Sequence, residues 1–142
     1  MTTIAHHKPD FSGEWHLNRE ASTLSPIVAP VVEGGVLKIA HHEPTFNCQM
    51  TIVMDGKPFD TKYELLTDGH ELGGTESGAR ISSCLRWDGD ALVAAWQIET
   101  PNGDMTIVFR YELQDTGRRL RASEQLRGGG RDQDNVWMFD RS

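Results

Sequence analysis

The chain has 142 residues, of which 37% are apolar and 25% are charged, and its formal net charge is −7. This length and composition suit one globular domain that buries its own hydrophobic core. The negative charge argues against proteins that bind nucleic acid or anionic membrane surfaces through basic patches. We therefore expect no nucleic-acid partner.

The sequence gives no sign of export or of membrane insertion. Residues 1–8 lack the apolar stretch of a secretory signal, and no apolar run approaches the ~20 residues of a membrane-spanning helix. Cys48 and Cys84 are the two cysteines, and neither belongs to a CxxC pair or a zinc-ligand spacing. We interpret them as reduced, buried thiols and expect a cytoplasmic location; the alternative is a mature exported chain whose leader has been removed.

The first predicted element covers residues 11–17, Phe-Ser-Gly-Glu-Trp-His-Leu. Phe11, Gly13, Trp15 and Leu17 alternate with polar residues, which predicts a strand with one buried face. Glycine inside a strand often marks a place where other backbone approaches closely, and we expect such an approach at Gly13.

Residues 20–34 interrupt the strand pattern. Pro26 and Pro30 stand among apolar residues, and two prolines four positions apart are incompatible with a long regular helix. The segment is therefore predicted to be a short apolar flap or a single helical turn between the first and second strands.

From residue 35 onward the chain reads as short alternating strands separated by turn signals such as Asp55-Gly56, a strong hairpin dipeptide. The spacing of about 8–12 residues is typical of all-β sandwiches and barrels. Successive tight hairpins favour a single up-and-down antiparallel β-barrel of about 8–10 strands, since closure removes the exposed edges of a meander. The predicted strands are residues 36–42, 45–54, 58–66, 70–76, 80–87, 91–100, 105–113, 119–125 and 135–140.

With these strands in place, the chain resembles the small bacterial lipocalin-like proteins of the calycin superfamily, which includes lipocalins and fatty-acid-binding proteins. The resemblance rests on residues 11–17, on Arg-Trp-Asp-Gly-Asp-Ala-Leu-Val at 86–93 and on Met-Phe-Asp-Arg at 138–141. It implies a lipocalin-like barrel domain over residues 10–142, preceded by a disordered or extended N-terminus at 1–9. It also implies that Trp15 plugs the closed end of the barrel.

In fatty-acid-binding proteins, a helical lid over the barrel mouth occupies the position of residues 20–34. The resemblance therefore implies a short lid segment after the first strand. The alternative is a segment that merely plugs one end of the barrel.

Two departures from these families bear on the ligand. Fatty-acid-binding proteins grip a carboxylate with an Arg-x-Tyr pair on the last strand, and the matching residues here are Trp137 and Phe139, which carry no positive charge. The haem-binding nitrobindin branch opens with G-x-W-x-G-x-G, whereas Leu17 and Arg19 occupy its later glycine positions. We therefore expect neither a fatty-acid clamp nor haem, and no cofactor.

The apolar face of each strand predicts what the interior contains. A barrel of this size holds one small ligand when alternate residues leave space, and such pockets are mostly apolar and aromatic. We therefore predict that the protein binds a small, mostly neutral hydrophobic molecule, aromatic or isoprenoid-like. The alternative is that the same side chains fill a solid core. The predicted ligand-binding residues are Ile39, Phe46, Cys48, Met50, Phe59, Tyr63, Leu85, Trp96, Phe109 and Tyr111.

Polar residues in phase with this face leave open whether the protein is an enzyme. His41, Glu124 and Tyr63 around a dry cavity would supply acid–base groups for an isomerase, cyclase, hydratase or lyase. The plainer alternative places His41 at a wet strand end. His41 and His42 point to opposite faces, so we expect no metal site. A third hypothesis is a filled barrel that acts through its outer surface as a homodimer.

Overall fold

The computed structural model describes residues 8–142, which form a ten-stranded antiparallel sheet in the order β4-β3-β2-β1-β10-β9-β8-β7-β6-β5. Each hairpin partner is the next strand along the chain, so the topology is up-and-down as predicted. The strands are β1 (Gly13–Leu17), β2 (Val32–His42), β3 (Thr45–Met54), β4 (Lys57–Leu66), β5 (Leu72–Glu76), β6 (Ala79–Asp88), β7 (Ala91–Thr100), β8 (Gly103–Gln114), β9 (Arg119–Gly128) and β10 (Gln133–Arg141).

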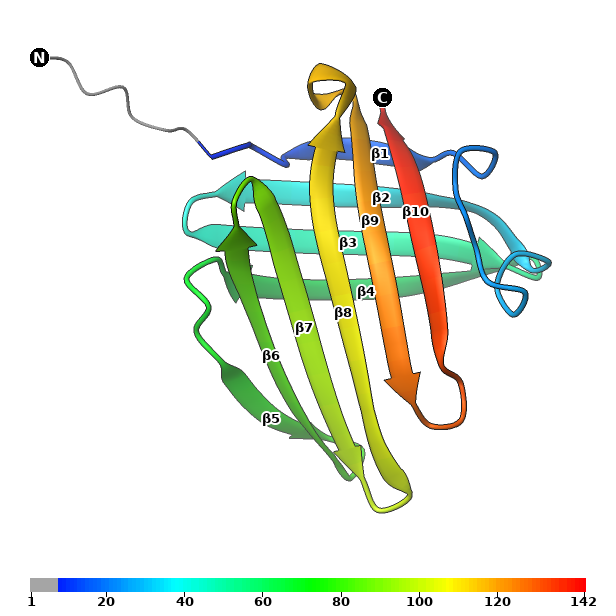
Figure 1. Ribbon diagram of the computed structural model, residues 1–142, viewed down its shortest axis with the longest axis vertical. Coiled ribbons are helices and arrows are strands. Elements are labelled where there is room, and N and C mark those ends of the chain that lie inside the picture. The colour runs from blue at the N-terminus through cyan, green and yellow to red at the C-terminus, as the bar shows by residue number, and fades with distance from the viewer. Residues whose placement is uncertain (1–7) are drawn as a thin grey trace, which may run out of the picture.

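The sheet curls so strongly that β1–β4 cross behind β6–β10 at a steep angle (Figure 1). This shape confirms the predicted all-β, up-and-down barrel. β4 and β5 are the two ends of the sheet order. The connection between them crosses the seam, where Asp68 bridges to Arg86 and the Gly69 N–H donates to the Leu85 carbonyl at 2.8 Å.

β1 joins the two groups of strands. Trp15 is in register with Leu37 of β2 on one side and with Arg141 of β10 on the other. The short first strand therefore continues the hydrogen-bonded ladder from the first half of the chain to the last strand.

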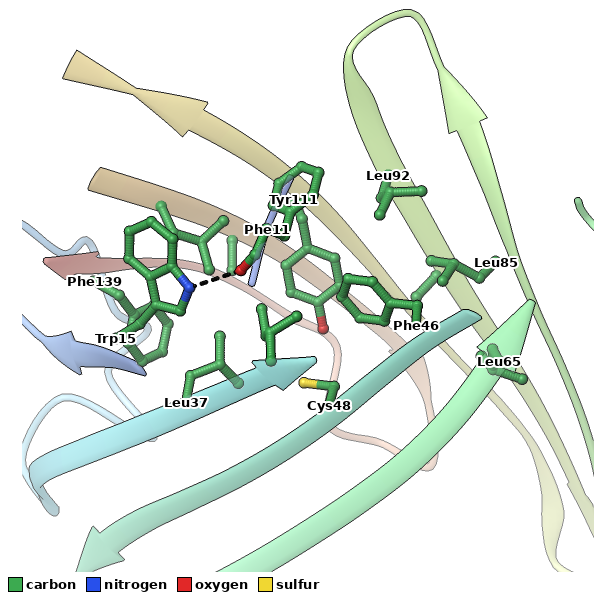
Figure 2. Packing of buried hydrophobic residues seen from close by; sticks show 14 residues of the cluster. Phe11, Trp15, Leu37, Phe46, Cys48, Leu65, Leu85, Leu92, Tyr111 and Phe139 are labelled. Atoms are coloured by element: carbon green, nitrogen blue, oxygen red, sulfur yellow. Dashed lines mark hydrogen bonds between the residues drawn. The ribbon is translucent and has the colours of Figure 1, made fainter. Parts of the chain in front are cut away.

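Trp15 is completely buried at this junction. Its indole Nε1 donates to the Phe11 carbonyl at 3.0 Å, the bond drawn in Figure 2, and the Arg141 guanidinium lies 4.1 Å from the ring centroid. Arg141 in turn donates to the Ser12 carbonyl at 2.7 Å. A Cβ on Gly13 would collide with the Arg141 guanidinium, so the close approach expected at this glycine is made by a side chain and not by backbone.

The turn between β3 and β4 follows its sequence signal. Asp55 and Gly56 have φ values of 50° and 73°, the left-handed conformations that a two-residue hairpin of this class requires. The Gly56 N–H also donates to the Glu33 carboxylate at 2.7 Å.

Residues 18–31 form the segment between β1 and β2, and they contain turns in place of a helix. The Ala29 N–H donates to the Ser25 carbonyl at 2.8 Å, which makes one helical turn between the two prolines. The segment lies earlier in the chain than the predicted 20–34, because β1 ends at Leu17 and β2 already begins at Val32, passing Gly34 through a register shift. We call residues 18–31 the flap.

The core lies inside the curl, where alternate residues of facing strands meet. Trp15 and Phe139 fill its β1–β10 side, and Figure 2 shows Leu65, Leu85 and Leu92 on the opposite side with Phe11, Phe46 and Tyr111 between them. Period-two alternation therefore produces one continuous apolar interior.

Replacing Trp15 by alanine is expected to lower the free energy of unfolding by about 3–5 kcal/mol, because it leaves a large cavity and removes the support of Arg141. Urea denaturation followed by circular dichroism measures the change. Ile27→Ala is the control, since that side chain is 57% exposed and its loss should matter by less than about 0.5 kcal/mol. Equal losses in the two variants would contradict a central role for Trp15.

Candidate functional site

A closed ring of aromatic contacts occupies the middle of the barrel. Phe46 contacts Tyr63 and Tyr111, Tyr63 contacts Trp96, and Phe109 completes the circuit, with centroid distances from 5.0 to 6.2 Å. These separations are those of favourable aromatic packing. We call these five residues the aromatic ring. Their side chains pack against one another, so this part of the interior is core.

The polar groups inside the aromatic ring satisfy one another. The hydroxyls of Tyr63 and Tyr111 are 3.0 Å apart and share a hydrogen bond. Burial raises the pKa of both phenols well above the usual 10.0. It also raises the pKa of the neighbouring Cys48 thiol to about 12. All three groups are therefore neutral at physiological pH.

A pocket of about 230 Å³ opens beside the aromatic ring, between β3–β4 on one side and β9–β10 on the other, with Val28 of the flap at its rim. We call it the mouth pocket. Its wall is mostly apolar. Besides Val28, the residues that line it are Met50, Ile52, Met54, Phe59, Thr61, Glu124, Leu126, Gln133, Asn135 and Trp137.

One wall of the mouth pocket is a hydrogen-bonded polar cluster centred on Glu124. Its Oε1 accepts from the Trp137 indole and from the Asn135 amide, each at 3.0 Å. The Asn135 side-chain oxygen accepts from the Ser25 N–H at 2.8 Å, and the Ser25 hydroxyl donates to Gln133 at 2.9 Å. This cluster fixes the flap to β10 and holds Glu124 at the pocket wall.

A second polar cluster lies at the other end of the barrel. The buried His41 ring accepts from the Phe11 N–H through Nδ1 at 3.2 Å and reaches the Glu43 carboxylate through Nε2 at 2.6 Å. Glu43 also accepts from the Trp87 indole and the Thr67 hydroxyl, each at 2.8 Å. Partial burial alone would raise the Glu43 pKa, but these donors lower it below the usual 4.5.

The two clusters do not share a pocket. Met50 is the lining residue of β3 nearest to Phe46, and it stands four residues from it, about 13 Å at ~3.3 Å per residue. The residues that line the mouth pocket include Glu124 but neither His41 nor Tyr63, and Tyr63 is bonded to Tyr111. The structure does not bring the three predicted acid–base residues together.

The predicted ligand-binding residues divide into three groups. Met50 and Phe59 line the mouth pocket, although the Phe59 ring is 51% exposed at its rim. Tyr63, Trp96 and Phe109 are partly buried and pack against the core. The remaining predicted residues are buried within that core and do not line the mouth pocket: Ile39, Phe46, Cys48, Leu85 and Tyr111.

Sequence reasoning missed most of the mouth pocket. Ile52 and Met54 follow Met50 at intervals of two and were recognisable by that spacing. Asn135 shares the phase of Trp137, but a buried asparagine carries no apolar signal in a strand pattern. Val28 gave no signal, since its position depends on how the flap folds.

A larger hollow of about 440 Å³ lies on the outer face of β5–β7. Gln97 and Glu99 border it, and both alternate with the inward-facing Trp96. We favour the mouth pocket as the candidate site, because it faces the interior and has the apolar lining that small-molecule sites share.

Within residues 8–142, no group of three or more His, Cys, Asp or Glu side chains is arranged to hold a metal ion. The same part of the chain contains no helix that is long and apolar enough to cross a membrane. The expected cytoplasmic location and the homodimer stay predictions.

No protein-family model and no curated protein sequence matches this chain. Solved structures do. Secretory abundant heat soluble protein 4 from Ramazzottius varieornatus is 15% identical, with 99% of each chain covered and a TM-score of 0.63. Human cRBP IV is 18% identical over 94% of this chain and 99% of its own, with a TM-score of 0.60. Zebrafish ileal bile acid-binding protein, complexed with cholic acid, is 13% identical over 93% and 98%, with a TM-score of 0.58.

The chain has the same β-barrel fold as these three proteins. In each comparison the aligned region covers nearly the whole length of both chains, so the entire barrel is similar. This confirms the barrel fold that the resemblance of residues 11–17, 86–93 and 138–141 implies. At these identities the likeness shows the fold alone, and the ligand has to be argued from the residues of this chain.

The two cysteines are expected to differ in reactivity. Cys48 is 2% exposed and its raised pKa leaves almost no thiolate at pH 8, whereas Cys84 is partly exposed. Iodoacetamide followed by peptide mass spectrometry should therefore label Cys84 first, and Cys48 only after unfolding in guanidinium. Equal labelling of both thiols in the native protein would show that Cys48 is accessible.

Glu43 is expected to make the barrel sensitive to acid. Its lowered pKa means that the ionised carboxylate is favoured in the folded state, so its contribution to stability is present above pH 4.5 and is lost as pH falls through the lower folded value. Urea unfolding of wild type and Glu43→Gln from about pH 3 to 7 measures this. The stability difference should be largest near neutrality and shrink in acid. A difference that is independent of pH would contradict the assignment.

Proposed function

We propose that this protein binds a small, mostly neutral hydrophobic molecule, aromatic or isoprenoid-like, in the mouth pocket. The observation that carries the proposal is the lining: Met50, Met54, Leu126 and Trp137 face a space of about 230 Å³ inside the barrel. Methionine adapts its shape to irregular partners, and an apolar wall favours molecules that leave water.

The size of the mouth pocket limits the guest. Sites for drug-sized ligands have volumes of about 300–1,000 Å³, which exceed the 230 Å³ found here. A guest that fits without rearrangement is therefore a single ring system or a short branched chain. The calycin fold supports the same role, since the zebrafish bile acid-binding protein holds cholic acid.

The rim of the mouth pocket is also apolar. Phe59 on β4 lines the pocket and is 51% exposed. Val28 of the flap also lines it, and its neighbour Ile27 is 57% exposed. These exposed apolar side chains offer a hydrophobic guest apolar contact at the opening.

The methionine methyl groups provide a local test. With ¹³C-methyl methionine, titration of 1-naphthol, geraniol or 1-octanol should shift the signals of Met50 and Met54. Met138 is the internal control, because it is buried on β10 and does not line the pocket. Absence of saturable shifts at Met50 and Met54 for all three compounds would overturn the proposal.

A blocked variant locates the binding event. Thr61→Trp places a large ring at the pocket rim, where Thr61 is exposed, and should weaken binding at least about ten-fold, or about 1.4 kcal/mol. Lys62→Trp is the matched control, since the next residue of β4 points away from the interior. Equal effects of the two substitutions would place the binding site elsewhere.

A further inference from the structure

We infer that the guest of the mouth pocket carries a primary ammonium group that contacts Glu124. This inference rests on the proposed function and adds one polar head group to an otherwise neutral hydrophobic ligand. It follows from a carboxylate that the fold places in an apolar pocket without a positive partner.

Glu124 is held in place through one of its two oxygens. Oε1 accepts both the Trp137 indole N–H and the Asn135 amide, each at 3.0 Å. Among the described residues, no donor bonds to Oε2. Asn135 is itself 1% exposed and bonded to the flap through Ser25, so the carboxylate has little freedom to turn away. One oxygen is therefore anchored and the other is available to a guest.

No basic side chain of the protein neutralises this carboxylate. The residues that line the mouth pocket include no Lys, Arg or His. The three arginines of β9 that alternate with Glu124 face outward and have partners there: Arg119 with Asp140 at 2.9 Å, Arg121 with Glu112 at 3.4 Å and Arg127 with Asp134 at 2.8 Å. A positively charged group that pairs with the Glu124 carboxylate would therefore have to come from the bound guest.

The surroundings define the head group that fits. Glu124 is half-buried, and a guest that fills the pocket removes water from its open oxygen, which is costly unless that oxygen is then paired and hydrogen-bonded. A primary ammonium offers three N–H donors and one positive charge, so it satisfies the open oxygen and cancels the charge together. An alcohol would donate a hydrogen bond to this oxygen but would leave the negative charge of Glu124 unpaired. A carboxylate on the guest would be repelled by that charge.

The apolar lining then receives the rest of the molecule. Met50, Ile52 and Met54 lie on β3, whereas Glu124 lies on β9 across the pocket. A guest that places its ammonium group on Glu124 therefore extends its hydrocarbon part toward the methionines. The predicted ligand is a hydrophobic primary amine.

Three eight-carbon compounds test the inference: octylamine, 1-octanol and octanoate, each titrated at pH 7 against the methyl signals of Met50 and Met54. The expected order of affinity in wild type is octylamine, then 1-octanol, then octanoate, with about ten-fold or more between the amine and the alcohol. If octylamine binds no more tightly than 1-octanol, the inference is wrong.

Glu124→Gln provides the second test. The glutamine side-chain oxygen still accepts from Trp137 and Asn135, so the wall keeps its hydrogen bonds while losing its charge. Octylamine should lose at least about ten-fold in affinity, and 1-octanol should change little. Glu64→Gln removes the same charge from an exposed residue of β4 and should leave both affinities unchanged, which separates a local contact from the overall net charge.

The outcomes distinguish the two proposals. Binding of 1-octanol at Met50 and Met54 without a preference for octylamine overturns the amine inference and leaves the hydrophobic site standing. Absence of any shift with 1-octanol, geraniol and 1-naphthol overturns the proposed function itself. A preference for octylamine that Glu64→Gln removes as fully as Glu124→Gln also contradicts the inference, since it would reflect long-range charge alone.

Discussion

The pairing of β1 with both β2 and β10 is the constraint on which the barrel depends. In the sheet order of residues 8–142, this five-residue strand stands between the ladder of β2–β4 and that of β5–β10 and pairs with both. Trp15 anchors it from the inside through its bond to Phe11, and Arg141 covers the indole and bonds to Ser12. Because these contacts bring the two halves of the sheet face to face, every inward side chain of one half meets those of the other.

The interior that results has two different parts. Around Phe46 and Tyr111 the aromatic side chains pack against one another and satisfy their own hydroxyls, so this part acts as core. Toward the flap the side chains become methionine and leucine, and the space between them opens into the mouth pocket. The sequence predicted that aromatic residues and methionines would surround a ligand. The structure uses most of the predicted aromatic residues to fill the barrel, and the pocket keeps Met50, Met54, Phe59 and Trp137.

Strand order and element type followed closely from the sequence, because two-residue alternation and turn dipeptides are local signals. Residues 45–54 and 91–100 were predicted with the bounds that the structure has. The mouth pocket was harder to predict, because it depends on how far apart facing strands lie and on where residues 18–31 settle. His41 and Glu124 were both in phase with the interior, yet phase along a strand does not tell at which end of the barrel a side chain arrives.

Among the strands of residues 8–142, β4 is hydrogen-bonded to β3 alone, and it carries Phe59 and Thr61 of the pocket wall. Displacing a strand that is paired on one side costs less free energy than displacing one that is paired on both sides, because it breaks half as many backbone hydrogen bonds. In the mouth pocket, the wall formed by β4 is therefore easier to displace than the opposite wall formed by β9 and β10. The size of guest that the mouth pocket admits therefore depends on how easily β4 is displaced as well as on the volume of the empty pocket. Substitutions on the solvent side of β4 would change the largest guest that fits.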